Sequence, residues 1–379
     1  MNFFNFLYPL ICFSSLFLTS CKNKLNVNAP YKELPTIYAV LNPQETIQMI
    51  RVNKVFLGEG NANDMAQVAD SINYQPGDLT ITLERFLNGA QTIATPTGNK
   101  QIITFHDSII QASPGAFNTT QRVYVTSDKL FVSGQYVLKV KNNKTTNVFI
   151  ARANAIDSIP DNYVYAPFNP PYYPVAPNSD PADPNIYPDY STANLTYSAK
   201  FKNNDAAIYT ITLRFHFYDS LYTDPKGDGS FKQYRFVDFN FGNQYIKDLR
   251  TFGNQKLFSF EFRKADLFSS IGYSLSKMNL DGAGAILGRK MCKMQPIIYT
   301  STQDYVDYLQ YTAPSLSIAQ EKPIYSNFDN RAAMGIFTFR SRRSVYKEMS
   351  STFISEFSFN PSTCKYYFYT SALAHQGCF

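Results

Sequence analysis

The sequence Leu-Thr-Ile-Thr-Leu-Glu-Arg-Phe, residues 79–86, alternates apolar and polar side chains. In an extended chain Leu79, Ile81 and Leu83 face one side, and the polar residues between them face the other. A period of two is typical of a half-buried strand. Asn88-Gly89 follows directly and predicts a tight turn.

Similar short segments surround this stretch and are separated by turn signals such as Pro114-Gly115 and Ser133-Gly134. The pattern predicts a β-sandwich domain over residues 35–156, of immunoglobulin-like or transthyretin-like type. The other predicted strands cover residues 36–41, 46–54, 101–105, 122–126, 135–141 and 147–152.

Composition favours the same fold class. Aromatic residues make up 16% of the 379 residues, with 28 Tyr, 32 Phe and no Trp, whereas charged residues make up only 17%. Phe and Tyr favour strands over helices, so we expect a mostly β chain. The length predicts two or three domains.

Residues 157–192 are rich in proline, which excludes a central strand and predicts an interdomain linker or a long surface loop. Its tyrosines offer a recognition surface or pack back on a neighbouring domain. The following residues 193–379 predict a second β-rich domain with a few short helices. Strands are expected at 195–202, 207–218, 231–239, 255–262, 293–299, 334–339 and 365–370, and helices at 266–278 and 302–311.

The N-terminus predicts export. Residues 1–20 hold no charged side chain and end in Leu18-Thr19-Ser20-Cys21, which resembles the lipobox of bacterial lipoproteins. The apolar run is interrupted by Pro9 and is too short for a membrane span. We therefore expect a signal peptide over residues 1–20, lipid on Cys21, and a tether over residues 21–34. An ordinary secretory peptide and an uncleaved anchor are the alternatives, because no Lys or Arg precedes the apolar core.

No acidic residue directly follows the cysteine; the next three residues, 22–24, are Lys-Asn-Lys. By resemblance to lipoprotein sorting rules, this favours the outer membrane over the inner one. The expected location is therefore lipid-anchored at the outer membrane, on its periplasmic or cell-surface face. Two acyl chains make such anchoring stable.

Three cysteines remain once Cys12 and Cys21 are assigned to the signal peptide and the lipid. In an oxidising compartment a bridge between Cys364 and Cys378 is plausible. Cys292 is left over, and no nearby His or Asn suggests thiol catalysis.

No catalytic, cofactor or metal pattern stands out. His106, His216 and His375 lack partners at metal-ligand spacing, and the chain has no nucleophile elbow, phosphate loop or His-Glu-x-x-His. Residues 224–229 fit a hairpin turn better than a calcium loop. A hydrolase would need two convergent carboxylates or a Ser-His pair, and Asp304 and Asp307 lie only one helical turn apart.

The net charge of +6 is spread along the chain, and no nucleic-acid-binding motif is present, so nucleic acid is not an expected partner. The one basic cluster is Arg340, Arg342, Arg343 and Lys347. Anionic lipopolysaccharide or an acidic partner would suit it, and a solvated strand end is the alternative.

A family resemblance follows from the C-terminal third. Residues 323–328, Pro-Ile-Tyr-Ser-Asn-Phe, then Gly335-Ile336-Phe337, lie behind a short helix that contains Tyr305 and Tyr308. Together they resemble the signature of an uncharacterised lipoprotein family of Bacteroidota. The resemblance implies a lipobox, an N-terminal immunoglobulin-like domain and a second β-rich domain, without an established activity. Such lipoproteins are often partners of TonB-dependent outer-membrane transporters.

Four Asp-Ser-apolar triplets resemble the acceptor for protein O-glycosylation in that phylum. Asp-Ser is also common turn chemistry at strand ends. The candidate serines are Ser71, Ser108, Ser158 and Ser220.

These features predict a non-catalytic surface lipoprotein that binds a ligand or associates with a transporter. A structural or adhesive envelope protein and a β-sandwich hydrolase are the alternatives.

Overall fold

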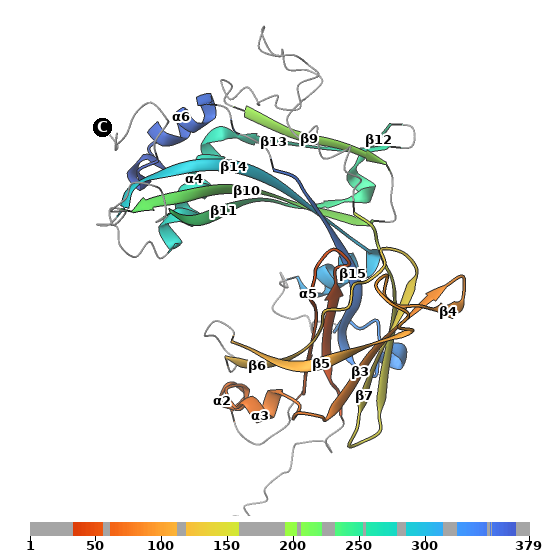
Figure 1. Ribbon diagram of the computed structural model, residues 1–379. Helices are drawn as coiled ribbons and strands as arrows, with labels where there is room; N and C mark the ends of the chain where they lie inside the picture. The colour runs from red at the N-terminus through yellow and green to blue at the C-terminus, as the bar shows by residue number, and fades with distance from the viewer. Residues whose placement is uncertain are drawn as a thin grey trace, which may run out of the picture.

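The computed structural model describes residues 33–55, 61–111, 119–158, 194–202, 206–221, 232–252, 255–278, 286–313, 324–346, 349 and 351–368. Strands dominate, and the helices are few and short, which confirms the predicted mostly β fold. Figure 1 shows two bodies, joined by the long strand β15 (Met334–Ser344).

The first body is a β-sandwich. One sheet has the order β15-β1-β2-β6-β5 and the other β5-β3-β7-β8, with β4 beside β3. Strand β5 belongs to both, because residues 102–105 pair with β3 and residues 106–111 pair with β6. The strands are β1 (Thr36–Leu41), β2 (Gln48–Asn53), β3 (Leu79–Leu87), β4 (Ala90–Thr92), β5 (Ile102–Gln111), β6 (Thr120–Thr126), β7 (Gln135–Asn142) and β8 (Val148–Asn154).

Alternation along each strand builds the core between the two sheets. On β3, Ile81 and Leu83 are fully buried while Thr80 is exposed, as the sequence pattern predicts. The rings of Tyr136 on β7 and Phe339 on β15 lie 5.1 Å apart and join the two sheets. Two short helices, α2 (Ala62–Ala66) and α3 (Ala69–Ile72), were not expected from the sequence.

Strand β15 connects the bodies. Residues 334–339 pair in parallel with β1, and residues 340–344 pair with β14 of the second body. Gly335 makes the close approach possible: its φ is +106°, and a Cβ there would lie 2.1 Å from the carbonyl oxygen of Ile37. Only glycine fits this position without displacing β1. The first sheet is therefore completed by a strand from the far end of the chain.

The second body holds the sheet β11-β10-β14 and a smaller sheet β12-β13-β9. All neighbours in these sheets are antiparallel. The elements of this body are β9 (Asn194–Lys202), β10 (Ile208–Leu221), β11 (Lys232–Tyr245), η3 (Ile246–Asp248), β12 (Arg250–Phe252), β13 (Gln255–Arg263), α4 (Lys264–Lys277), β14 (Ile286–Ser301), α6 (Ser351–Phe359) and η6 (Cys364–Tyr366). Helix α5 (Gln303–Thr312) packs on β15 at the joint, and η5 (Asp329–Arg331) lies beside β8 of the first body.

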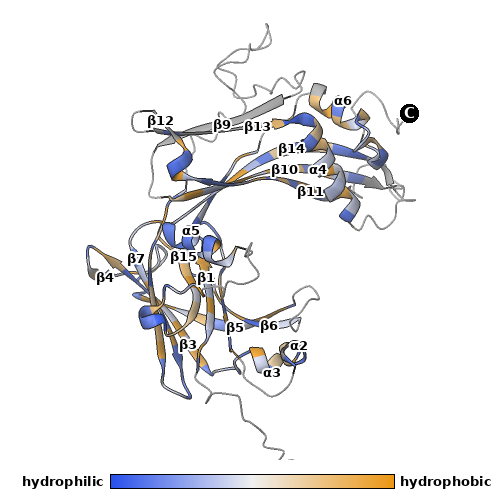
Figure 2. Cartoon of the chain, turned by 180° about the vertical axis from the view of Figure 1, so that it is seen from behind, coloured by the Kyte–Doolittle hydropathy of each residue, from blue (hydrophilic) through white to orange (hydrophobic). Residues whose placement is uncertain are grey.

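Aromatic rings fill the space between β10 and the helices α4 and α6. The ring of Phe353 lies 5.8 Å from Phe215 on β10 and 5.6 Å from Phe268 on α4. Phe357 and Phe217 both contact Phe368. The face of β10 that carries Phe215 and Phe217 is called the inner face below. Figure 2 shows the resulting mixture of hydrophobic and hydrophilic residues along the strands.

Most predicted elements are present, but one predicted strand is wrong and a further helix was missed. The strand expected at residues 365–370 is wrong: a 3-10 helix ends at Tyr366, and Tyr367 is left-handed with φ of 59°. Helix α6 was missed. The helix expected at 302–311 is α5. The Thr302 side chain at its start accepts no hydrogen bond from the first turn, and its hydroxyl hydrogen-bonds Thr338 instead.

The predicted signal peptide, nearly all of the tether and linker, Lys347, His375 and residues 224–229 lie outside the described residues. In the described part of the chain, no helix has the length and hydrophobicity needed to cross a membrane.

Candidate functional site

The outer face of strand β10 carries the most organised group of exposed side chains. Because residues alternate, Phe215 and Phe217 face the core, while Arg214 and His216, which precede them in turn, are only half-buried. Their partners across the ladder are Asp238 and Phe236 of β11. This places charged and aromatic groups side by side on one surface.

Arg214 is held by two neighbours at once. Its Nε and Nη2 donate to the two oxygens of Asp238 at 2.8 and 3.0 Å, a bidentate pair. The same guanidinium lies 3.8 Å from the ring centroid of Phe236. The hydrogen bonds that Arg214 donates to Asp238 raise the pKa of Arg214. The pair is electrically neutral and fixed in orientation.

His216 lies between two rings. Its Nε2 is 2.9 Å from Oε1 of Gln295, whose amide nitrogen donates to the Ser344 hydroxyl. Phe236 and Tyr346 flank the imidazole, at 6.2 and 5.4 Å between ring centroids. Gln295 is buried, so its hydrogen bonds fix the position of the imidazole.

Further rings extend this surface in both directions. Tyr234 is 74% exposed, and its ring lies 5.9 Å from that of Tyr218. On the side of β15, Arg340 lies 3.6 Å from the ring centroid of Tyr299. We call this surface the aromatic face. Its members are Arg214, His216, Tyr218, Tyr234, Phe236, Asp238, Gln295, Tyr299, Arg340 and Tyr346.

The predicted basic cluster is divided by the structure. Arg340 belongs to the aromatic face, and Arg342 forms a 3.6 Å ion pair with Glu45 of the first body. Both are half-buried rather than a solvated strand end. The aromatic face itself was missed. The sequence contained a pattern that could have revealed this face. In two strands, every second position carries a large aromatic or charged residue, where a sheet with one face in water normally carries small polar ones. These residues are Arg214, His216 and Tyr218 in β10 and Tyr234, Phe236 and Asp238 in β11.

A cavity lies on the outer face of the first sheet, away from the aromatic face. It is a cavity of about 830 Å³ beside β1 and β2, with Thr36, Tyr38 and Val40 facing it from one strand and Met49, Arg51 and Asn53 from the next. The register Tyr38 opposite Arg51 puts these side chains on the same face. Lys54, Val55, Ile72 and Gln121 complete the lining.

Tyrosines of the α5 region lie at the Tyr38 side of this cavity. The ring of Tyr308 is 6.2 Å from Tyr38 and 5.8 Å from Tyr325. The Tyr325 hydroxyl reaches Asp304 at 3.5 Å. Burial raises the pKa of Asp304, and the nearby Asp307 raises it further. The two carboxylates are neighbours on one helix and do not face each other across a cleft.

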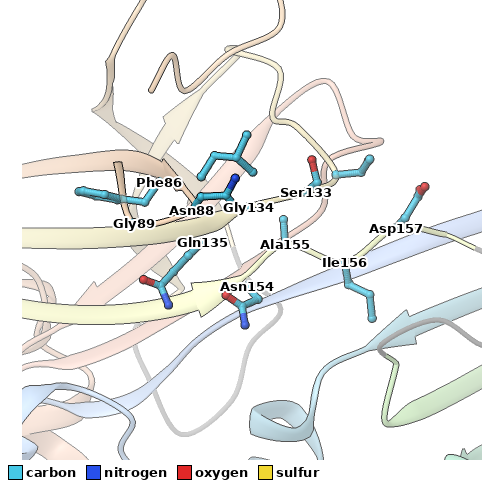
Figure 3. Close-up of a pocket in the computed structure, with 12 residues that line it drawn as sticks. Phe86, Asn88, Gly89, Ser133, Gly134, Gln135, Asn154, Ala155, Ile156 and Asp157 are labelled. Carbon is cyan, nitrogen blue, oxygen red and sulfur yellow. The ribbon is translucent and has the colours of Figure 1, made fainter. Parts of the chain in front are cut away.

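A polar hollow of about 590 Å³ lies at the end of the second sheet (Figure 3). Its wall includes the Asn88-Gly89 turn, whose φ angles of 51° and 82° are those of a tight hairpin turn. Gln135 and Asn154 are paired across β7 and β8 and lie side by side in Figure 3. Asp157 is the one charged residue among the described residues of the lining, so no opposite charge faces it there.

The predicted histidines stand apart. His106 is exposed on β5 of the first body, and His216 lies on the aromatic face of the second. The part of the chain that the structure describes contains no group of three His, Cys, Asp or Glu side chains placed to hold a metal ion.

The other predicted site residues fall in separate places. Cys364 is buried and disulfide-bonded, whereas Cys292 carries a reduced thiol. Cys21 and Cys378 lie outside the described residues, so the lipidation and the Cys364 to Cys378 pairing stay predictions.

The four candidate serines do not share a location. Ser71 lies on α3, Ser108 on β5 and Ser158 after β8, and all three are half-buried. Ser220 lies on β10, directly after the fully buried Asp219. Glycosylation of these serines stays a prediction.

Residues 324–328 and 335–337, which carry most of the family resemblance, lie at the joint between the bodies. The side chain of Asn327 both donates to the carbonyl of Phe337 and accepts from its amide, at 2.7 and 2.9 Å. Phe328 is buried and bridges to Ala151 of β8. These residues hold β15 in place. The motif thus has a structural role.

With this geometry in view, the chain was compared with known proteins. It matches no family model and no curated protein. The resemblance to the lipoprotein family stays a prediction.

Proposed function

We propose that the chain is a non-catalytic, lipid-anchored binding protein of the outer membrane, and that the aromatic face binds a neutral polyhydroxylated ligand, a glycan. The observation that carries the proposal is the exposed, preorganised group of rings and planar polar side chains on β10, β11, β14 and β15. The anchor rests on the sequence around Cys21.

The chemistry of the surface favours sugars. The apolar faces of a pyranose stack on aromatic rings, and its hydroxyls exchange hydrogen bonds with planar side chains. Tyr234, Phe236 and Tyr346 are 74, 46 and 57% exposed and supply the rings. Asp238 supplies acceptors, and Arg214 supplies donors. The Arg214–Asp238 pair is neutral, so the centre of the face has no preference for an ionic ligand.

Preorganisation supports the same interpretation. Arg214, His216 and Gln295 each have hydrogen-bond partners in the unbound protein. Fixing them before binding lowers the entropy that association costs. A surface of loosely held exposed rings would bind with less specificity.

Association with a transporter is the second part of the proposal and is supported only by the family resemblance. Pull-down from solubilised outer membranes tests it, with recovery of a TonB-dependent transporter as the expected result. Repeated recovery of the chain alone would contradict this part and leave glycan binding standing.

Affinity electrophoresis tests the binding face. The full chain is run through gels that contain amylose, dextran, xylan or mannan, with polygalacturonate as an acidic arm. We expect retardation by at least one neutral polymer. Tyr234→Ala should weaken it about tenfold or more, because truncating a central aromatic contact costs about 2 kcal/mol or more.

Tyr273→Ala is the matched control, since Tyr273 on α4 is 66% exposed and lies outside the aromatic face. Equal loss with both variants would contradict the assignment of the face. Retardation by none of the neutral polymers would contradict the glycan class.

A further inference from the structure

We propose that the cavity beside β1 and β2 is a second binding site, for a single-chain amphiphile with an anionic head group. This site is separate from the aromatic face and does not depend on the proposed glycan binding.

The cavity offers apolar surface that the fold leaves uncovered. Tyr38, Val40 and Met49 are 38, 36 and 48% exposed, although each is a large apolar side chain in the middle of a strand. On the same strands Ile37 and Ile50 are fully buried in the sandwich. Apolar residues on both faces of two paired strands are unusual for a sheet with one face in water. The outer set therefore has a binding role.

Concavity distinguishes this surface from a scattered set of exposed residues. The side chains enclose about 830 Å³, within the range of about 300–1,000 Å³ that is typical of small-molecule sites. Ile72, at the end of α3, is buried against the cavity and adds to its apolar wall. An alkyl chain fits a hollow with these walls.

The charges of the lining select the head group. Arg51 and Lys54 both line the cavity, and none of its described lining residues is a carboxylate. Among the described residues neither forms an ion pair: Nε of Arg51 donates to Asn53, and Nζ of Lys54 donates to the carbonyl of Asp70. The two terminal nitrogens of Arg51 remain for a carboxylate or phosphate, which a guanidinium binds in a bidentate manner. Cationic and neutral heads lack this contact.

Photolabelling of the full chain tests the proposal. The protein is placed in phosphatidylcholine vesicles with a fatty acid that carries a diazirine, and labelled peptides are located by mass spectrometry. Saturable labelling of peptides within residues 36–55 is expected. Laurate and dodecyl phosphate should compete, and their relative strength distinguishes a fatty acid from a phospholipid-like head. Dodecylammonium should not compete.

Three variants sharpen the test. Arg51→Gln should raise the laurate concentration needed for competition about tenfold, because the variant loses a charge-assisted contact to the head group. Met49→Gln should lower labelling, whereas Ile109→Gln, at a 54% exposed residue of β5 outside the cavity, should not. Unchanged thermal unfolding midpoints show that each variant folds.

Three results would overturn the proposal: labelling that does not saturate, equal competition by laurate and dodecylammonium, or equal loss with Met49→Gln and Ile109→Gln.

Discussion

On the inner face of β10, Asp219 is fully buried between Arg235 and Arg289, whereas on the outer face Arg214 and Asp238 pair with side chains 24 and 31% exposed. Both arrangements join an aspartate to arginine at 2.7–2.8 Å. Arg289 also donates to the carbonyl of Tyr366, so the inner group ties the C-terminal segment to the sheet.

The difference shows how burial changes the role of the same chemistry. Removing one partner of a buried pair leaves an uncompensated charge in a medium of low polarity. Water and salt compensate most of the loss when the pair is partly exposed. The inner face therefore stabilises the fold, and the outer face keeps its groups available to a ligand.

Asp219→Asn tests the buried pair, where we expect the largest loss of stability. The variant should lose about 3–5 kcal/mol in free energy of unfolding, because Arg289 stays buried without its charged partner. Asp238→Asn should lose about 1 kcal/mol or less. Chemical denaturation of both variants measures the difference, and equal losses would contradict the contrast between the faces.

Gly335→Ala tests whether the two bodies share one sheet through β15. The left-handed backbone costs an alanine about 1–2 kcal/mol, and overlap with the Ile37 carbonyl adds to it. Gly98→Ala is the matched control, since Gly98 has φ of +113° and open space around its Cβ position. A loss no greater than that of Gly98→Ala, in thermal unfolding, would show that β15 does not lie tightly against β1.

Substitution of Glu33 should have the smallest effect on the free energy of unfolding, and this effect should depend on pH. Burial raises the pKa of Glu33, but hydrogen bonds from Thr145, Asn142, Asn147 and Tyr74 outweigh it and lower the pKa below 4.5. The charged form therefore stabilises the folded chain above about pH 4.5, and this contribution disappears as the pH falls through the lowered pKa.

Glu33→Gln should cost about 1 kcal/mol at pH 7, since Glu33 is half-buried and water compensates part of the loss. The difference in free energy of unfolding between the variant and the parent chain should shrink on acidification, as measured by unfolding at pH 7 and pH 3. A difference that widens toward pH 3 would contradict the assignment.

Local patterns in the sequence predicted much of the first body. Strands such as residues 79–87 alternate strictly and end in turn residues, so each could be recognised alone. Helices α2 and α3 were missed because helices of five and four residues carry too few repeats for a period to show. The strand expected at 365–370 failed because aromatic content favoured β structure, whereas packing of Tyr366 against α4 fixed a 3-10 turn.

Long-range pairing was beyond local patterns. The parallel contact between β1 and β15 joins residues almost 300 positions apart, and residues 324–328 help to hold β15 there. The aromatic face likewise combines four strands. His216 was visible in the sequence as a strand histidine, but its neighbours Phe236, Gln295 and Tyr346 come together only in the folded sheet.

Paired truncation of the two faces tests the central claim most directly, with unfolding and glycan retardation measured on the same samples. Phe217→Ala, on the inner face, should lose about 3–5 kcal/mol of stability and keep its affinity for the glycan wherever it is folded. Phe236→Ala, on the outer face, should keep its stability within about 1 kcal/mol and lose glycan retardation. Retardation that survives Phe236→Ala unchanged would contradict the assignment of the outer face as the binding surface.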